Sequence, residues 1–505
     1  MSVLKPGNNS SGIFPATSTG VIIDACDYYR LFYETASKAR RYILMTGWQF
    51  DTEVSLLRGK DADSAGGEVH FISFLESLCE RNPELEVYIL AWDFTVFLTL
   101  EREWFQNLIF AWSTNERIHF CFDNKHAFNA SHHQKLVIID GKIAFVGGMD
   151  ICSARWDDRY HHMENPYRKD ADETVYGSYH DIQSYHTGPI VNELVDIFQQ
   201  RWLDSGAGQL LLPAIDGPAP EIDYTPLFPM PADRVAISRT QAKNLQPPTE
   251  EMLEIRQLYV DAIMSAERLI YIENQYFSSH AIYWALVDRM TNAERSRLQI
   301  IMILPDRLPF TEELFLGLPQ MRMLRSLQQV ADTNGHSLRV YSTVCIKGEE
   351  RKMTFIHSKL LLVDDLFLTI GSANITNRSM GLDTELNVTW EAEAGQTELI
   401  ASIRAVRASL LAEHAGKYGQ NQEFRFERID ELVYYLDHLV DDPDTRLCRY
   451  APESSLENSS WPEVLEPIAR IVDPEEDLFE KFSKQAGNAF AKGIQILNQI
   501  IAGPT

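Results

Sequence analysis

The sequence predicts an α/β protein built from two similar halves. Three observations favour this fold class: short apolar runs alternate with amphipathic segments, the order of the runs repeats, and one motif occurs twice. The first copy of the motif begins at His133 and the second at His357. We therefore expect two homologous α/β domains with mixed β-sheets in α-β-α-β-α layers. A pseudo-twofold axis would relate them and place a site at their interface.

The elements of the first half follow one another in a regular order. The pattern predicts a helix over 25–40, a buried strand over 41–50, a helix over 72–81, and strands over 85–93 and 117–122. The second half repeats the strand sequences, with counterparts at 266–270, 298–306 and 338–341. Strands that alternate with helices favour largely buried sheets in both halves.

The domain boundaries follow from composition. Residues 1–20 are rich in Ser, Asn, Gly, Pro and Thr, and prolines cluster in the stretch after Trp202. Beyond residue 420, Asp and Glu accumulate and the apolar pattern weakens. We expect a loose lead-in (1–20), a first domain (21–210), a proline-rich linker (211–234), a second domain (235–420) and an acidic C-terminal extension (421–505).

Composition and net charge limit the classes of function that the protein can have. The chain has 505 residues, of which 45% are hydrophobic, and a net charge of −26. This charge opposes binding to nucleic acid and to strongly anionic membranes. The six cysteines have neither disulfide-framework nor metal-ligand spacing, so we expect reduced thiols and no bound metal. The N-terminus predicts no secretory signal, and no apolar run is long enough to span a membrane.

Both copies of the motif have the form HxKxxxxD and are followed by a pair of small residues. In the first copy, His133 and Lys135 lead into an apolar run, and residues two apart on a strand point to the same face. The aspartates lie at an odd spacing and begin tight turns, so we interpret them as shaping the loops. The candidate catalytic set is His133, Lys135, Asp140, His357, Lys359 and Asp364.

These motifs resemble the pair that the phospholipase D superfamily brings together at one phosphodiester-cleaving site. Residues 147–150, 271–277 and 413–416 are similar to phosphatidylcholine-type phospholipase D of the bacterial kind, which lacks PX and PH modules. The resemblance runs from about residue 21 to about residue 416. With only about 20 residues ahead of it, we expect no lipid-targeting module before the first half.

The resemblance implies a double displacement through a phosphohistidine intermediate, without a cofactor. One imidazole attacks phosphorus, the other protonates the leaving alcohol, and the two ammonium groups bind the non-bridging oxygens. The family pattern favours His133 as the nucleophile and His357 as the general acid.

A carboxylate on the other nitrogen of each imidazole would fix its tautomer and orientation. By the resemblance, Glu385 serves the second-motif histidine and Asp181 the first-motif histidine. Ser372 and Asn374 correspond to the family's phosphate-binding pair. The first copy has Gly148 and Asp150 at the equivalent offsets, so the two halves differ.

The predicted function is a phospholipase D that hydrolyses the head-group phosphodiester of glycerophospholipids to phosphatidic acid and transfers phosphatidyl groups to alcohols. Three alternatives stay open: a phosphatidyltransferase of the cardiolipin-synthase kind, a nuclease or other phosphodiesterase, and a non-catalytic binding protein. The lack of expected N-terminal membrane segments counts against the phosphatidyltransferase, and the acidic charge counts against the nuclease. The intact motifs count against a non-catalytic binding protein.

The expected partners are a phospholipid at a membrane surface or micelle and a water or alcohol acceptor, with no nucleic acid. We expect a monomer in the cytoplasm or at the periphery of a membrane. Export without a Sec-type signal peptide stays open.

Overall fold

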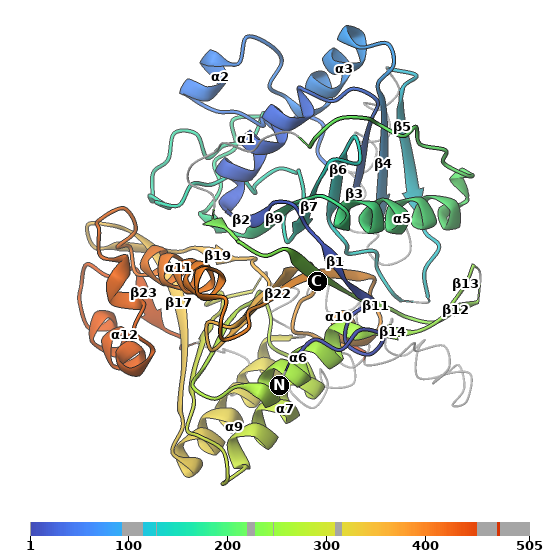
Figure 1. The fold of residues 1–505 in the computed structure, drawn as a ribbon. Coiled ribbons are helices and arrows are strands. Elements are labelled where there is room, and N and C mark those ends of the chain that lie inside the picture. The colour runs from blue at the N-terminus through green and yellow to red at the C-terminus, as the bar shows by residue number, and fades with distance from the viewer. Residues whose placement is uncertain are drawn as a thin grey trace, which may run out of the picture.

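The computed structural model describes residues 2–92, 115–127, 129–219, 228–245, 247–308, 316–451 and 472–474. Its centre consists of two large β-sheets, one for each half of the chain (Figure 1). The first sheet contains, in spatial order, β10 (Phe228–Pro229), β2 (Thr19–Ile23), β9 (Ile182–Thr187), β7 (Ile143–Gly147), β6 (Leu136–Ile139), β3 (Tyr42–Gly47), β4 (Glu86–Trp92) and β5 (Ile118–Asp123).

The second sheet repeats this order. It contains β1 (Gly12–Pro15), β11 (Arg234–Gln241), β22 (Glu385–Glu391), β21 (Phe367–Gly371), β20 (Leu360–Val363), β15 (Leu269–Glu273), β16 (Gln299–Ile303), β17 (Ser337–Lys347) and β18 (Glu350–Met353). Strand β14 (Met252–Leu253) pairs with β11, and β23 (Leu447–Arg449) with β17. Between the edges, the two sheets match strand for strand, with parallel and antiparallel pairs at corresponding places. The predicted mixed α/β fold and internal repeat are confirmed.

The sheets pack against each other through one central core. Strand β7 of the first sheet contacts β21 and β22, while β21 of the second contacts β7 and β9, as a twofold relation requires. Apolar residues of both sheets share this core with α5 (Ile190–Trp202) and α11 (Thr397–His414). The two motif strands, β6 and β20, both contribute to it, which brings the two halves of the candidate site together.

Helices cover the outer faces of the sheets. A second core joins the first sheet to α1 (Asp24–Ala36) and α3 (Phe71–Arg81), and a third joins the second sheet to α6 (Glu254–Ser265), α7 (His280–Thr291) and α9 (Leu318–Asn334). The layers therefore run α-β-α-β-α, as predicted (Figure 1). The remaining described α-helices are α2 (Lys60–Ser64), α10 (Asn377–Gly381) and α12 (Leu432–Val440).

The segments that lead into the two halves exchange partners. Strand β1 precedes the first half but pairs with β11 of the second sheet, from Gly12 opposite Ile237 to Pro15 opposite Arg234. Strand β10 precedes the second half but pairs with β2 of the first sheet. Part of the lead-in expected to be loose therefore forms a sheet edge, because backbone pairing does not require apolar side chains.

Part of the predicted C-terminal extension belongs to the second half. Helix α12 packs into the central core, and β23 adds to the edge of the second sheet. Residues 452–471 and 475–505 of the extension, and 220–227 of the predicted linker, lie outside the described residues. Among the residues that are described, no helix combines the length and apolarity needed to cross a membrane.

Candidate active site

Backbone contacts between the halves position the two motif histidines. The amide of His357 donates to the carbonyl of His180 at 2.8 Å, where the short strands β8 (Tyr179–His180) and β19 (Phe355–Ile356) pair. The amide of His133 donates to the carbonyl of Thr384 at 2.9 Å. Each motif histidine is therefore fixed to the residue that precedes the candidate carboxylate of the opposite half.

The histidine–carboxylate pairs follow this crossing. His133 Nδ1 lies 3.0 Å from Glu385 Oε2, and His357 Nδ1 lies 2.6 Å from Asp181 Oδ2. The pairing expected from the resemblance is therefore wrong, because each carboxylate meets the histidine of the other half. These contacts engage Nδ1, so Nε2 is the nitrogen of each ring that can face a substrate.

The two lysines lie with the histidines, but their surroundings differ. Lys135 Nζ is 3.1 Å from Asp150 Oδ2 and donates to the carbonyl of His133 at 3.2 Å. Lys359 Nζ donates to the carbonyl of His357, and the residue equivalent to Asp150 is the neutral Asn374. Burial lowers the pKa of Lys359 to about 7. Lys359 can therefore lose its proton near neutral pH before an anion binds.

Burial and positive charge set the protonation of the site. Burial lowers the pKa of His133 well below its usual value, and the charges of Lys135 and Lys359 lower it further. The pKa of His357 falls for the same reasons. At neutral pH both imidazoles are therefore neutral in this structure. A phosphodiester anion between the ammonium groups would oppose these charges and raise the imidazole pKa again.

Small residues make room for the carboxylates. A Cβ on Gly148 would lie 2.2 Å from Asp181 Oδ1, so a side chain there would displace that carboxylate. The equivalent residue is Ser372, whose hydroxyl donates to Glu385. Burial raises the pKa of Asp181 to about 7 and that of Glu385 to about 8. In this structure Ser372 supports a carboxylate, and its phosphate contact stays a prediction, as does that of Asn374.

The motif aspartates lie at turns. Asp140 accepts from the backbone amides of residues 40–42, and Asp364 accepts from those of residues 267–269. Both have a positive φ, 54° for Asp140 and 55° for Asp364. Each carboxylate therefore ties its turn to the start of the neighbouring strand, away from the paired histidines.

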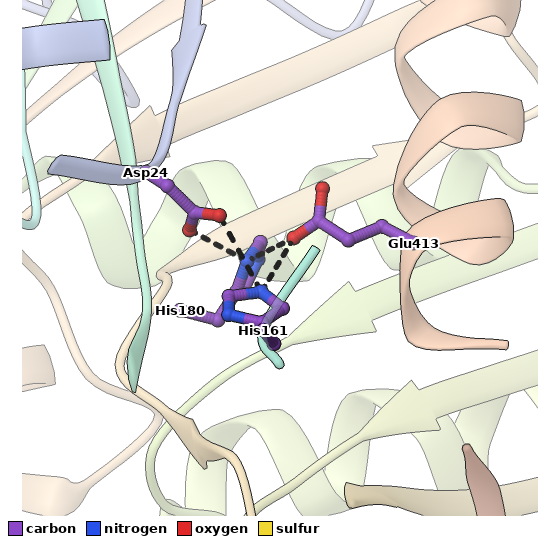
Figure 2. Close-up of side chains that lie close together, drawn as sticks. All are labelled: Asp24, His161, His180 and Glu413. Carbon is purple, nitrogen blue, oxygen red and sulfur yellow. Dashed lines mark hydrogen bonds and ion pairs between the residues drawn. The ribbon is translucent and has the colours of Figure 1, made fainter. Parts of the chain in front are cut away.

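A buried cluster beside the site was not predicted from the sequence. Asp24, His161, His180 and Glu413 each place one nitrogen or oxygen within 4.8 Å of the others, and all four are buried (Figure 2). Nitrogen–oxygen distances of 2.7–3.4 Å join them as ion pairs. Spacing along the chain could not reveal this set, because its members come from four separate segments.

The class of protein follows from the repeated α/β fold and from the site, which combines two crossed histidine–carboxylate pairs with two lysines. A family model described as phospholipase D matches residues 35–220, and one described as cardiolipin synthase, PLD-like domain, matches residues 259–406. The chain belongs to the phospholipase D superfamily, with one matching domain in each half.

Particular relatives can be named. The chain is 24% identical to phospholipase D alpha 1 of Zea mays in an alignment that covers 76% of this chain and 63% of that protein. It is 27% identical to phospholipase D A of Dictyostelium discoideum over 428 residues, 72% of this chain and 32% of that protein. The match thus spans less than two thirds of the length of either relative.

A solved structure shares the fold. The phosphatidylserine synthase of Haemophilus influenzae Rd KW20 superposes with a TM-score of 0.52 at 13% identity, covering 85% of this chain and 95% of that one.

Proposed function

We propose that this protein is a phospholipase D that hydrolyses the head-group phosphodiester of glycerophospholipids to phosphatidic acid. The observation that carries the proposal is the crossed pairing of His133 with Glu385 and of His357 with Asp181, beside two buried lysines. The relatives in Zea mays and Dictyostelium discoideum, both named phospholipase D, support the same reaction class.

The proposed first step breaks the bond between phosphorus and the head-group oxygen. Nε2 of neutral His133 attacks phosphorus and becomes covalently bound to it, while protonated His357 gives its Nε2 proton to the departing alkoxide. Lys135 and Lys359 neutralise the non-bridging oxygens as charge develops. The contact with Glu385 holds the nucleophile's ring and disperses the positive charge that it gains.

The second step returns the enzyme to its starting state. His357, now neutral, removes a proton from water, and the resulting hydroxide oxygen displaces His133 from phosphorus to give phosphatidic acid. A primary alcohol in place of water gives the phosphatidyl alcohol by the same bond changes. The bacterial type, the monomeric state and peripheral membrane action predicted above belong to this proposal. So do the predicted domain boundaries, with the changes to the lead-in and the C-terminal extension described above.

The test is an assay of the purified full chain on a panel of glycerophospholipids, with and without a primary alcohol. We expect release of the free head group and formation of phosphatidic acid, with a phosphatidyl alcohol appearing when the alcohol is present. Rapid quenching with a short-chain substrate should leave its phosphatidyl group on the peptide that contains His133. Label on the His357 peptide alone would reverse the two roles. No release of head group from any lipid would refute the proposal.

A phosphatidyltransferase of the cardiolipin-synthase kind is the second candidate. It is favoured by the family model that matches residues 259–406, whose description is cardiolipin synthase, PLD-like domain. The two functions differ in acceptor. Phosphatidylglycerol supplied as the sole lipid would yield cardiolipin and glycerol from a transferase, but phosphatidic acid and glycerol from a phospholipase D.

A further inference from the structure

A buried carboxylate contacts the neighbours of one histidine–carboxylate pair. Glu273, the last residue of β15, accepts from Ser358 Oγ at 2.7 Å and from His180 Nε2 at 3.0 Å, both through Oε2. Ser358 directly follows His357, and His180 directly precedes Asp181. One carboxylate oxygen therefore ties together the two chain segments that form the His357–Asp181 pair.

The other oxygen of Glu273 is also engaged. Oε1 accepts from His414 Nε2 at 2.9 Å and from the hydroxyl of Tyr271, and the side chain of Glu273 is fully buried. Burial would raise the pKa of Glu273, but its contacts with His414 and His180 outweigh burial and lower it. The carboxylate is therefore ionised and accepts from four donors, so its position is closely determined.

His180 is held on both of its nitrogens. Nε2 binds Glu273, and Nδ1 lies 2.7 Å from Glu413 Oε1 and 3.0 Å from Asp24 Oδ1 (Figure 2). Burial would lower the pKa of His180, but Asp24 and Glu413 outweigh it and raise the pKa well above its usual value. The ring is thus a charged imidazolium that cannot rotate without breaking an ion pair.

In the described part of the first half, the neighbours of His133 are supported differently. The residue that follows His133 is Gln134, whose amide donates to the carbonyl of Glu385 at 3.2 Å. The position that corresponds to Glu273 in the sheet is Thr46, whose hydroxyl donates to the carbonyl of Gln134 at 3.2 Å. The neighbours of His133 are held instead by Asp123, which pairs with His132 and with Arg201, while Arg201 donates to Gln134 Oε1 at 3.2 Å. A single carboxylate oxygen that binds both segments of a histidine–carboxylate pair is therefore seen, among the described residues, only beside His357.

We propose that Glu273 is a positioning residue of the active site, which holds His357 and Asp181 in productive alignment by binding Ser358 and His180. The proposal rests on the function proposed above, in which His357 protonates the leaving group. Proton transfer needs a hydrogen-bond geometry that tolerates little displacement, so loss of this support should impair the acid step more than attack by His133.

The experiment compares two short-chain phosphatidyl esters that differ only in leaving group. Choline leaves as a poor alkoxide and needs a proton, whereas p-nitrophenolate needs little protonation. Glu273→Ala should lower kcat/KM for the choline ester about 100-fold, and for the nitrophenyl ester less than about tenfold. Ser358→Ala removes one of the two tethers, so it should give the same asymmetry at about tenfold loss for the choline ester.

The conservative variant and a control separate positioning from general destabilisation. Glu273→Gln should recover most of the choline-ester activity, because its carbonyl oxygen can still accept from Ser358 and His180. The control is Asp365→Ala, which breaks a buried ion pair with Arg407 in the same half. It should leave the ratio of the two activities at the wild-type value.

The outcomes are distinct. Equal losses on both esters in Glu273→Ala would overturn the proposal. If that variant does not fold, equal losses in Ser358→Ala would overturn it instead. A wild-type protein that cleaves neither ester would refute the proposed function, and the positioning role would fall with it.

Discussion

Gly148 offers a direct test of the crossed pairing between His357 and Asp181. In Gly148→Ala the new methyl carbon would lie 2.2 Å from Asp181 Oδ1. The carboxylate has little freedom to retreat, because Oδ1 accepts from the amide of Ile182 at 2.7 Å while Oδ2 lies 2.6 Å from His357 Nδ1. Restoring ordinary contact requires a movement of about 1 Å. We therefore expect this substitution to break the hydrogen bond to His357.

The size of the effect follows from that bond. A hydrogen bond to a charged group contributes about 1.5–3 kcal/mol, and about 1.4 kcal/mol corresponds to a factor of ten in rate. Gly148→Ala should thus lower kcat on a short-chain phosphatidylcholine about 10- to 150-fold. Gly177→Ala is the matched control, since a Cβ there meets no atom within 4 Å. It should retain wild-type kcat.

A double variant tests whether the methyl group acts through the carboxylate. If it does, Gly148→Ala combined with Asp181→Asn should lose little more activity than Asp181→Asn alone. Steady-state kinetics and thermal melting of the same preparations would be measured together. A Gly148→Ala protein that melts like the wild type and keeps more than half of its kcat would refute the steric reasoning.

Three further predictions concern the whole site and its stability. His133→Ala and His357→Ala should each remove nearly all turnover without additive losses, and a tenth of wild-type rate in either would contradict a single shared site. Burial raises the pKa of Glu385 from 4.5 to about 8, so the folded protein holds a proton in this range that the unfolded chain releases. The free energy of unfolding should therefore fall as pH rises from 4.5 to about 8. Urea unfolding at several pH values should show a smaller decrease of this free energy in Glu385→Gln. Asp365→Ala leaves buried Arg407 unpaired and should lower the free energy of unfolding by about 3–5 kcal/mol; a loss below about 1 kcal/mol would contradict this.

Local patterns sufficed to predict much of the fold. The apolar runs that contain β3, β4, β6 and β20 are visible in sequence because a buried strand keeps its pattern over consecutive residues. The repeated motif likewise predicted that His133 and His357 share a site. What the sequence could not give was the partner of each carboxylate, because that depends on how the two sheets dock.

The features that were missed share this physical origin. Glu273 lies in the stretch 271–277, which resembles the family, but no local pattern shows what it binds, because three of its four donors come from other segments. Strand β1 lies in a stretch whose composition is that of a loop, and only its pairing with β11 makes it a strand. Long-range contacts decide both cases.

The exchanged edge strands bear on how the protein can be divided. A cut within residues 211–227 would give two fragments, each carrying the edge strand that its partner needs. Alone, each fragment would expose an unpaired edge, on β2 or on β11, as a template for association with other chains. Together they would have reason to reassemble, since each returns the missing edge of the other. The fold is therefore a natural candidate for a split reporter, in which restored hydrolysis signals that two fused partners have met.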